Sequence, residues 1–504
     1  MIMTTTPPLW TPDALIMASG AACDGEITSA ITGFSIDTRS LRAGDVFVAL
    51  TDQRDGHEFV EAAFNAGAAA ALVRRDYARC PSDGCLLRVD DPLRALERIG
   101  RAARARLADD AKVIAVTGSA GKTTTKEMLR ACFEAVAPGH VHAAVKSFNN
   151  HWGVPLTLAN MPEDTAFGVF EIGMNHAGEI TPLTEMVRPH VALVTSVLPV
   201  HVGNFDDGID GVAHAKAEIF AGLTPKAGFA ILPRDTTHFE VLRDRATAAL
   251  GIAPSDWSED FGVFTFGEHA DADQGVDVEH SEFRADGSEV AFRFGKGATV
   301  PVISDIQVPG RHNASNAAGA IAAWFAATTH RDMPTTPGEA FPGLGATLDA
   351  LADLKIAPEG RGQVHQLADE ITLIDESYNA NPASVAAALA TLSLYPVDRR
   401  RIAVLGDMLE LGAGAEAMHT GLVTALQDAS VAKLYCCGPH MKALFDCIPV
   451  QMRGAWAETS VSLEHRMLDG IGPGDVVVIK GSLGSRMQPL TAALKARYLS
   501  SGGD

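Results

Sequence analysis

The segment Thr117-Gly118-Ser119-Ala120-Gly121-Lys122-Thr123-Thr124-Thr125 has the composition and context of a phosphate-binding loop, because it follows an apolar run and opens a helical pattern. Glycine lets the backbone turn so that successive N–H groups point at phosphate oxygens, and the helix N-terminus adds positive potential. Lys122 is placed to reach β- and γ-phosphates, and the hydroxyl of Thr123 or Thr124 to hold Mg²⁺. Val116 stands where the usual pattern has its first glycine. The flanking strand, glycines and hydroxyls together favour a phosphate loop over an ordinary turn with a surface lysine.

Polar side chains also follow two further apolar runs in the middle of the chain. Glu171 ends the run 168–172, and His201 follows the run 191–197. In a parallel sheet both positions lie at the edge that carries the phosphate loop, so either side chain could bind a divalent ion or contact substrate. A solvated strand end and a surface histidine are the alternatives. Lys216 lies on a predicted helix, and its spacing alone assigns it no role beyond a solvated cation.

Two asparagines occur at the start of a predicted helix. Asn313 and Asn316 belong to the run Gly310-Arg311-His312-Asn313-Ala314-Ser315-Asn316. An asparagine at this place is often only an N-cap. A second one, a turn later, is less easily explained by capping, and its amide suits the edge of a nucleobase.

Four loops in the last third combine polar residues with glycine next to predicted strands. They are Gly360-Arg361-Gly362, Asp375-Glu376-Ser377-Tyr378-Asn379-Ala380-Asn381-Pro382, residues 406–412 and residues 480–486. Loops of this kind share one edge of an open α/β sheet, where ligands bind. Arg361 offers a cation, and Asp375 and Glu376 could bind a ribose or a metal-bound phosphate. Asn381 fits a helix N-cap with Pro382 at the first helical position.

The elements that must position these residues predict an α/β fold of three domains, because apolar strand-length runs alternate with helical patterns. Residues 1–110 are expected to form a small α/β domain with strands at 46–50 and 69–73 and a helix at 92–107. Residues 111–357 are expected to form a central parallel-sheet domain around the phosphate loop. Residues 358–504 are expected to form a Rossmann-like, doubly wound domain.

The expected strands place the candidate loops at sheet edges. Those of the central domain are 113–116, 168–172, 191–197 and 229–232, and those of the C-terminal domain are 371–374, 402–405, 433–437 and 476–479. Residues 261–308 contain short alternating runs at 263–266, 276–278, 289–294 and 299–303, which predict an antiparallel subsheet attached to the central domain. A helix is expected at 314–328, and the Pro- and Gly-rich stretch 334–362 is the predicted linker.

Composition excludes several classes of protein. The chain has 504 residues, with 41 Lys plus Arg against 62 Asp plus Glu, a net charge of −21. Such an acidic protein lacks the positive field of a non-specific nucleic-acid binder. Its apolar runs are too short to span a membrane, and its first twelve residues lack a secretory signal, so we expect a cytoplasmic protein. Its seven cysteines form neither a disulfide framework nor a CxxC pair. Nothing indicates an obligate interface, so we expect a monomer.

In chain order, these motifs resemble those of the Mur ligase family over nearly the whole chain. Singly the motifs are modest, and together they are highly specific. Besides the phosphate loop they are residues 171–175, His201, residues 215–218, 312–316, 360–362, 377–382 and 405–408. Two further runs, Ser147-Phe148-Asn149-Asn150 and Gly153-Val154-Pro155, together with residues 377–382, are similar to the members that add D-alanyl-D-alanine.

The resemblance implies a three-domain enzyme of cell-wall precursor synthesis that uses ATP to join D-alanyl-D-alanine to UDP-N-acetylmuramoyl-tripeptide. The terminal carboxylate of the tripeptide attacks the γ-phosphate, which gives an acyl phosphate and ADP. The dipeptide amine then attacks the acyl carbon, and phosphate leaves. A carboxylate and a triphosphate repel each other, so cations must screen them and hold them in line.

The resemblance also implies which residues hold ATP and metal. The ATP phosphates fall to Gly118, Ser119, Ala120, Gly121, Lys122, Thr123 and Thr124. Asn313 and Asn316 would face adenine and ATP, Arg361 a phosphate, and Asp375 or Glu376 the ribose. Thr123 and Glu171 would bind one Mg²⁺, and His201 a second. Lys216 matches the family lysine that is carbamylated, a change that turns a cation into an anion able to support the second metal. The catalytic residues on this basis are Lys122, His201 and Lys216.

Substrate contacts are implied in all three domains. Ser35, Thr38 and Arg39, followed by Asp55-Gly56-His57, resemble the part that receives the UDP-sugar. The remaining substrate residues are Asn149, Asn150, Tyr378, Asn379 and Asn381. ATP would lie between the second and third domains, with residues 360–362 as the hinge on which the third domain closes.

The chain departs from the family at one motif, and two other classes of protein stay open. Leu483 stands where an arginine is expected after Lys480-Gly481-Ser482, and Arg486 is a candidate to replace it. One alternative class is an amide ligase for another acid, either another Mur ligase or a folylpolyglutamate synthase. The other is a non-catalytic nucleotide-binding protein, against which the intact candidate residues argue.

Overall fold

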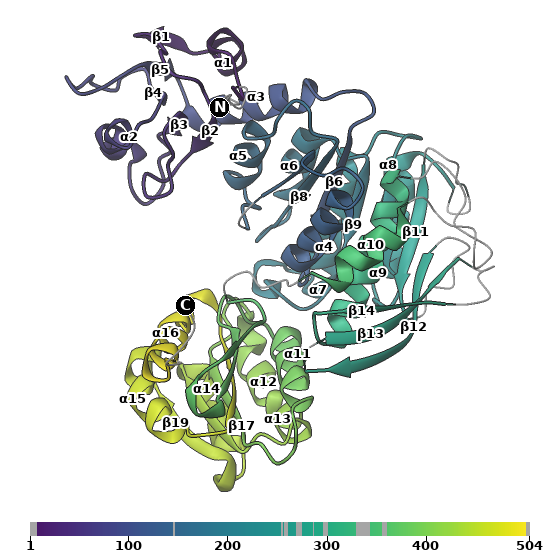
Figure 1. The fold of residues 1–504 in the computed structure, drawn as a ribbon. Coiled ribbons are helices and arrows are strands. Elements are labelled where there is room, and N and C mark those ends of the chain that lie inside the picture. Colours follow the sequence, from purple (N-terminus) through teal and green to yellow (C-terminus); the bar gives the residue numbers. More distant parts are fainter. Residues whose placement is uncertain are drawn as a thin grey trace, which may run out of the picture.

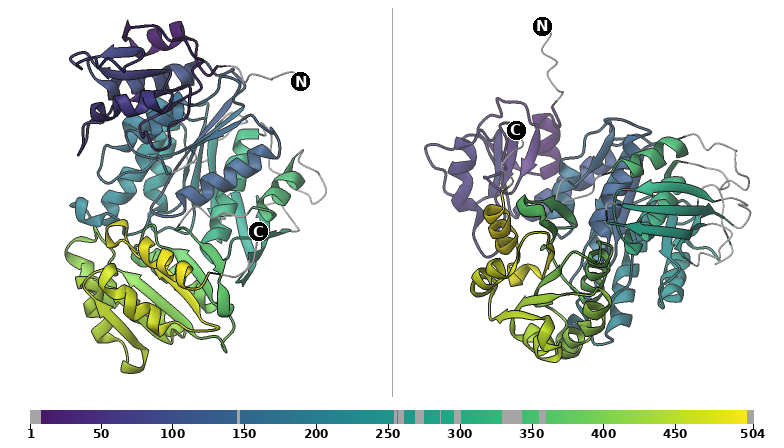
Figure 2. Two further views of the ribbon diagram at one scale, coloured as in Figure 1. Left: turned by 60° about the vertical axis from the view of Figure 1, so that its left-hand side comes forward. Right: turned by 60° about the horizontal axis from the view of Figure 1, so that its bottom comes forward.

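Three β-sheets organise the chain in the computed structural model, which describes residues 8–144, 147–253, 256, 261–268, 275–285, 287–295, 301–328, 343–354 and 360–499. Each sheet has its own helices, and the central part lies between the other two (Figure 1; Figure 2, left). The three-domain α/β class predicted from the sequence is confirmed. The predicted boundary at residues 357 and 358 lies outside the described residues, as do residues 334–342 and 355–359 of the predicted linker 334–362. The linker prediction is wrong for residues 344–352, which form a helix that packs on the central part.

The N-terminal part is a five-stranded sheet in the order β1-β5-β4-β3-β2, and only β1 runs antiparallel to its neighbour. Its strands are β1 (Ala22–Asp24), β2 (Gly33–Ser35), β3 (Asp45–Val48), β4 (Ala70–Arg74) and β5 (Leu86–Val89), and its helices α1 (Pro12–Ser19), α2 (Val60–Asn65) and α3 (Pro92–Ala105). The predicted strands 46–50 and 69–73 and the helix 92–107 are therefore confirmed. Asp91 caps α3 by accepting from the N–H groups of Leu93 and Arg94, which explains why that helix begins there.

The central part is a nine-stranded sheet in the order β14-β13-β12-β11-β10-β9-β6-β8-β7. Its strands are β6 (Lys112–Thr117), β7 (Val141–Ala143), β8 (Phe167–Glu171), β9 (Val191–Val194), β10 (Phe229–Pro233), β11 (Gly262–Gly267), β12 (Gly275–Arg284), β13 (Gly287–Phe294) and β14 (Val302–Ile306). Its helices are α4 (Lys122–Glu134), α5 (Gly153–Ala159), α6 (Ile180–Val187), α7 (Ile209–Ala217), α8 (Phe239–Leu250), α9 (Arg311–Thr328) and α10 (Leu344–Ala352).

Both faces of this sheet are buried, which is why its strands read as continuous apolar runs. Along β6, Ile114 and Val116 pack with α4, α9 and α10, whereas Val113 and Ala115 pack with helices α5 to α8. The antiparallel subsheet is confirmed for β12, β13 and β14. The sequence grouped β11 with these strands, but it pairs parallel with both β10 and β12, so the subsheet extends the main sheet.

The C-terminal part is a doubly wound sheet in the order β15-β16-β20-β17-β18-β19, as expected. Its strands are β15 (Gln363–Gln366), β16 (Thr372–Glu376), β17 (Arg401–Gly406), β18 (Lys433–Cys437), β19 (Arg453–Ala457) and β20 (Val476–Lys480). Helices α11 to α14 cover one face, and α15 and α16 the other. These helices are α11 (Pro382–Ser393), α12 (Ala415–Thr420), α13 (Leu422–Asp428), α14 (Pro439–Cys447), α15 (Ser460–Gly470) and α16 (Gln488–Arg497).

The N-terminal and central parts are joined through α5 and the segment that follows it. Asn160 bonds to both backbone groups of Phe34, accepting from its N–H at 2.9 Å and donating to its carbonyl at 3.2 Å. The indole N–H of Trp10 donates to the carbonyl of Ala159 at 3.0 Å, and Arg106 lies over the Trp10 ring. Buried side chains of α3 and α5 share one apolar cluster, so packing and hydrogen bonds together fix this junction.

The central and C-terminal parts meet through shorter segments. Ala285, at the tip of the β12–β13 hairpin, packs against the apolar cluster of the C-terminal sheet. A second contact brings Gly203 against Gly412, where a Cβ on either residue would lie 3.0 Å from the Cα of the other. Among the described residues, no helix combines the length and the apolar character that a bilayer crossing requires.

Candidate active site

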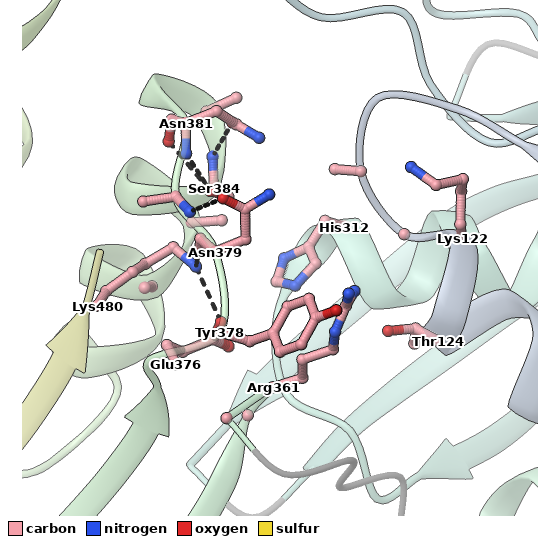
Figure 3. Close-up of a pocket in the computed structure, with 18 of the residues that line it drawn as sticks. Lys122, Thr124, His312, Arg361, Glu376, Tyr378, Asn379, Asn381, Ser384 and Lys480 are labelled. Atoms are coloured by element: carbon pink, nitrogen blue, oxygen red, sulfur yellow. Dashed lines mark hydrogen bonds and ion pairs between the residues drawn. The ribbon is translucent and has the colours of Figure 1, made fainter. Parts of the chain in front are cut away.

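A cavity of about 1410 Å³ lies between the central and C-terminal parts, at the carboxyl ends of their parallel strands. The phosphate-loop segment and the start of α9 form one wall, and the loops after β16, β17 and β20 form the other. Figure 3 shows Lys122 and Thr124 on the first wall and Glu376, Asn379 and Lys480 on the second. Ligands bind at such an edge in open α/β sheets, so the topology brings the predicted loops to one place.

The phosphate loop has the backbone that its glycines allow. Gly121 begins α4 with φ +82°, and a Cβ there would lie 2.4 Å from Oδ1 of Asn316. Gly118 has φ +149°, and a Cβ there would lie 1.8 Å from Oγ1 of Thr195. Two loop N–H groups expected to face phosphate are instead bonded to Ser196, from Ser119 at 2.9 Å and from Ala120 at 3.0 Å.

Lys122 lines the cavity and folds back over the loop. Its Nζ donates to the carbonyl oxygen of Gly118 at 2.7 Å. Burial lowers the pKa of Lys122, the carboxylate of Glu171 opposes this shift, and the guanidinium of Arg361 adds to it. The cation therefore lies where solvent screens it weakly and an anionic ligand is attracted strongly.

Thr123, Glu171 and Asn149 form a buried cluster behind the loop. Glu171 Oε2 accepts from the Thr123 hydroxyl at 2.9 Å, and Oε1 accepts from Asn149 Nδ2 at 2.7 Å. Ser147 lies 3.1 Å from the same hydroxyl. A carboxylate and hydroxyl oxygens are the ligands that Mg²⁺ prefers, so this cluster has the right chemistry for one Mg²⁺.

His201 and Lys216 lie beside Lys122. Burial lowers the pKa of His201, an effect that Glu410 opposes and the ammonium groups of Lys216 and Lys122 reinforce. Burial also holds the pKa of Lys216 well below its usual range, and the charge of Lys122 lowers it further. Lys216 is 3% exposed, and no carboxylate in the described ranges forms an ion pair with it. Lys216 does not line the cavity itself.

The start of α9 closes the loop side of the cavity. Asn313 and Asn316 both line it, and Asn316 Nδ2 donates to Asn313 Oδ1 at 3.4 Å. Asn313 Nδ2 donates to the carbonyl of Pro309 at 2.8 Å, so this residue links the helix to the loop before it. His312 lies between the two walls (Figure 3), and desolvation lowers its pKa.

The C-terminal wall carries an ordered set of polar groups. Arg361 stacks on Tyr378, with its guanidinium carbon 4.2 Å from the ring centre. Lys480 Nζ donates to Glu376 Oε2 at 3.0 Å and to the Asn379 carbonyl at 2.9 Å (Figure 3). A capping box formed by Asn381 and Ser384 begins α11 at this wall.

Several predicted site residues lie elsewhere. Asp375 is buried on the far side of its strand, where Oδ1 accepts from the Ser377 hydroxyl at 2.6 Å, and its neighbour Glu376 lines the cavity instead. Asn150 lies in the turn before α5, where its Oδ1 accepts from the N–H of Gly153 at 2.9 Å. Arg486, the candidate to replace the missing arginine, is exposed and outside the cavity lining.

The predicted UDP-sugar residues lie in the N-terminal part and not at the cavity. The Ser35 hydroxyl donates to the carbonyl of Asp37 at 2.9 Å, and Arg39 forms an ion pair with the Asp37 carboxylate. Thr38 lies between them and is partly exposed. Their roles remain predictions.

Sequence reasoning assigned no role to three residues that the structure places at the cavity. Lys480 ends β20 and Glu410 lies in the loop after β17, within two segments that the sequence selected only as groups. His312 comes from the motif that supplies Asn313. The sequence feature that could have indicated these three residues is their position at the end of a predicted strand or at the start of a predicted helix. The pairing of Lys480 with Glu376 could not be found this way, because it depends on β16 lying beside β20.

Comparison with known proteins agrees with this geometry. Residues 116–324 match the Mur ligase middle domain, and residues 360–483 match the Mur ligase, glutamate ligase domain. The chain is similar to the UDP-N-acetylmuramoyl-tripeptide–D-alanyl-D-alanine ligase of Escherichia coli, with 33% identity over 94% of this chain and 96% of that protein. It is similar to the ligase of the same name from Bacillus subtilis, with 32% identity over 92% and 93%.

The fold agrees with a solved relative. The crystal structure of MurF from Acinetobacter baumannii covers 97% of this chain and 99% of its own, with a TM-score of 0.78 and 27% identity. Identity at this level over almost the full length, together with two matched domains, shows common descent and not only a shared fold. The chain belongs to the Mur ligase family.

Proposed function

We propose that this protein is an ATP-dependent ligase that joins D-alanyl-D-alanine to UDP-N-acetylmuramoyl-tripeptide, giving UDP-N-acetylmuramoyl-pentapeptide, ADP and phosphate. The observation that carries the proposal is the cavity that combines the Lys122 loop with the Asn379 and Lys480 wall, in a chain 33% identical to a ligase named for this reaction. We place the reaction in the cytoplasm, where ATP is available.

The nucleotide is proposed to lie across the cavity. Lys122 and the start of α4 attract its phosphates through a cation, backbone N–H groups and the helix dipole. The two loop N–H groups now bonded to Ser196 must be released if they are to bind phosphate. On the opposite wall, Arg361 supplies a further cation, and Glu376 replaces Asp375 as the residue proposed for the ribose, because only Glu376 lines the cavity.

Two Mg²⁺ sites are proposed beside the phosphates. Thr123 and Glu171 would hold the first, because their oxygens already converge within 2.9 Å. His201 and a carbamylated Lys216 would hold the second. Burial of Lys216 without an anionic partner supports this modification, because conversion to a carbamate replaces an uncompensated buried cation with a metal ligand. When bound, the metal ions screen the phosphates and stabilise the charge that develops on transfer.

The chain's own groups then perform two tasks. The first is to bring the tripeptide carboxylate in line with the γ-phosphate, against the repulsion of two anions, for which Lys122 provides neutralising charge. The second is to present the dipeptide amine to the acyl phosphate from the C-terminal wall, where Tyr378, Asn379 and Asn381 offer polar contacts. Closing the cavity between the two walls excludes water, which would otherwise hydrolyse the acyl phosphate.

The test is release of ADP by the purified protein with UDP-N-acetylmuramoyl-tripeptide, in the presence and absence of D-alanyl-D-alanine. We expect rapid ADP release only when both are present, and a product whose mass equals that of the pentapeptide. Parallel reactions with tripeptide ending in diaminopimelate or in lysine identify the third residue. Turnover that depends instead on glutamate and a folate, or on a single amino acid, contradicts the proposal.

A further inference from the structure

Glu410 of the C-terminal part contacts the ring of His201 of the central part. Oε2 of Glu410 lies against Nδ1 of His201, across a separation of 209 residues in the chain. Each residue comes shortly before a short 3₁₀ helix, Val202–Asn204 in one part and Gly412–Gly414 in the other. At this contact Gly203 and Gly412 approach so closely that neither could carry a side chain without a shift.

Both residues adopt an unusual backbone conformation to make this contact. His201 has φ +60° and Glu410 has φ +63°, in the left-handed region that residues with a Cβ rarely occupy. Local sequence preference therefore does not explain either conformation. Surrounding structure holds each backbone so that the two side chains meet. Left-handed residues also occur elsewhere in this chain, but here two of them lie on facing loops and bring their side chains into contact.

The chemistry of the contact fixes the histidine ring. A carboxylate only accepts hydrogen bonds, so Nδ1 of His201 carries the proton and Nε2 keeps its lone pair. Histidines that bind a metal through one ring nitrogen generally donate the other N–H to a carboxylate or carbonyl, which sets the tautomer and the ring orientation. Glu410 also brings an anion to a place where the charges of Lys122 and Lys216 act on the same ring.

We propose that Glu410 is a positioning residue for the second metal site: closure of the C-terminal part places its carboxylate on His201, which orients the ring with Nε2 available to the metal. This inference rests on the proposed function and adds one point to that function. Loading of the second metal then depends on closure of the cavity, because the orienting group and the metal ligand come from opposite walls.

The test is the binding of Mn²⁺, used as a paramagnetic substitute for Mg²⁺, to the full-length protein with a non-hydrolysable ATP analogue. Electron paramagnetic resonance measures free Mn²⁺ during the titration. We expect two Mn²⁺ per wild-type chain, and a second site about 10- to 100-fold weaker in Glu410→Ala. Glu410→Gln keeps an acceptor oxygen for Nδ1 and should bind within about threefold of wild type. Glu416→Ala, an exposed glutamate on α12 outside the cavity, is the matched control and should bind as wild type.

Each outcome decides the proposal. A wild-type chain with one Mn²⁺, a Glu410→Ala chain with an unchanged second site, or equal weakening by Glu410→Ala and Glu410→Gln overturns it. Small-angle scattering of the same samples shows whether Glu410→Ala opens the molecule. If the contact served only to hold the two parts together, the variant would change the scattering but keep the Mn²⁺ affinity of the closed form. The titration contains no peptide substrate, so failure of the ligase reaction with normal Mn²⁺ binding contradicts the proposed function alone.

Discussion

The hydroxyl of Thr123 donates to Oε2 of Glu171 at 2.9 Å, and this bond joins the first turn of α4 to the end of β8. The neighbouring strands β6 and β8 run parallel, so their carboxyl ends bring both groups to one edge of the sheet. Asn149 bonds to the other carboxylate oxygen, which leaves Glu171 fully oriented before any ligand arrives. A preoriented carboxylate binds a small, rigid cation such as Mg²⁺ with little further ordering.

Glu171→Gln keeps the size of the side chain and an acceptor for Thr123 but removes the charge. We expect the Mg²⁺ concentration for half-maximal turnover to rise by about 10- to 100-fold, because a hard cation prefers an anionic oxygen. Turnover measured across a Mg²⁺ series checks this. Glu179→Gln is the matched control, since Glu179 bonds at the surface to Asn175 and His176 and does not line the cavity. An unchanged Mg²⁺ dependence in Glu171→Gln contradicts the assignment.

Lys122→Ala should lower kcat by about 10²- to 10³-fold, the usual effect of removing one preorganised charge from a transferring group. The fold should survive, because the hydrogen bond from Nζ to Gly118 is local to the loop. Steady-state ADP release measures the effect, and circular dichroism checks the fold. Lys442→Ala, which removes a partly exposed lysine paired with Asp446 outside the cavity, should leave kcat unchanged. Normal turnover by Lys122→Ala would remove the main support for the proposed phosphate site.

Gly121→Ala should weaken nucleotide binding strongly. A Cβ at this position lies 2.4 Å from Oδ1 of Asn316, in addition to the cost of φ +82°. Gly178→Ala is the control that separates the steric clash from the cost of a positive φ. Gly178 has φ +84°, and an added Cβ there would have nothing within 4 Å. We expect Gly178→Ala to lower stability by about 1–2 kcal/mol and to bind the ATP analogue normally. Calorimetric titration of both variants is the measurement, and equal affinities contradict the proposed role of the loop.

Substitutions of Asp375 and of Glu376 should differ in their effect on the KM for ATP. Asp375 is 2% exposed, accepts two hydrogen bonds from Ser377 and lies 3.7 Å from Lys495, so Asp375→Ala should destabilise the C-terminal part by about 1–3 kcal/mol. Glu376→Gln keeps an oxygen that can accept from Lys480 but removes the anionic partner of that buried ammonium, so it should lower stability. It should also raise the KM for ATP, by about tenfold, because it offers the ribose an uncharged and therefore weaker acceptor. Urea unfolding and ATP kinetics distinguish them. A raised KM for ATP in a stable Asp375→Ala chain reverses the assignment.

Two partly buried histidines should make the stability of the central part depend on pH. Burial lowers the pKa of both His142 and His190 to about 4, and for His190 the neighbouring charges of Arg104, Lys112 and Arg188 add to the effect. The N–H of Val113 donates to Nδ1 of His190 at 2.9 Å, a bond that requires that nitrogen to be unprotonated. Between pH 6.5 and 4 the unfolded chain binds more protons than the folded one, so stability is complete above about pH 6.5 and falls as pH decreases through this window.

His190→Asn measures the contribution of one of these groups. Asn can accept from Val113 but does not titrate, so the variant should lose about 1–2 kcal/mol less than wild type between pH 7 and pH 4.5. Urea unfolding followed by tryptophan fluorescence at each pH gives the comparison. Parallel curves for the two proteins would show that His190 does not contribute to the acid sensitivity.

The sequence predicted the elements that are long, apolar and buried on both faces. Strands β6, β8 and β16 were found within a few residues, because a continuous apolar run of this length between turn signals is typical of a buried strand. Short strands at sheet edges, such as β1 and β7, carry no such run and were missed. The parallel pairing of β11 was missed because alternation along a strand does not reveal the direction of its neighbours.

For the site, local sequence patterns predicted which loops would lie at the cavity, and the structure showed which residues of each loop line it. Spacing could not tell Asp375 from Glu376, because adjacent strand residues point to opposite faces and the register is set by pairing with β20. Lys216 looked like a solvated lysine because helical spacing does not report that α7 is covered. The contact between His201 and Glu410 joins two domains, and no local signal could indicate it.

The double hydrogen bond between Asn160 and Phe34, with Trp10 beside it, bears on how the cavity can widen. These bonds and a shared apolar cluster hold the N-terminal and central parts together, whereas the C-terminal part meets the central part through shorter segments. Any widening of the cavity is therefore expected to come from displacement of residues 360–499 relative to the other two parts.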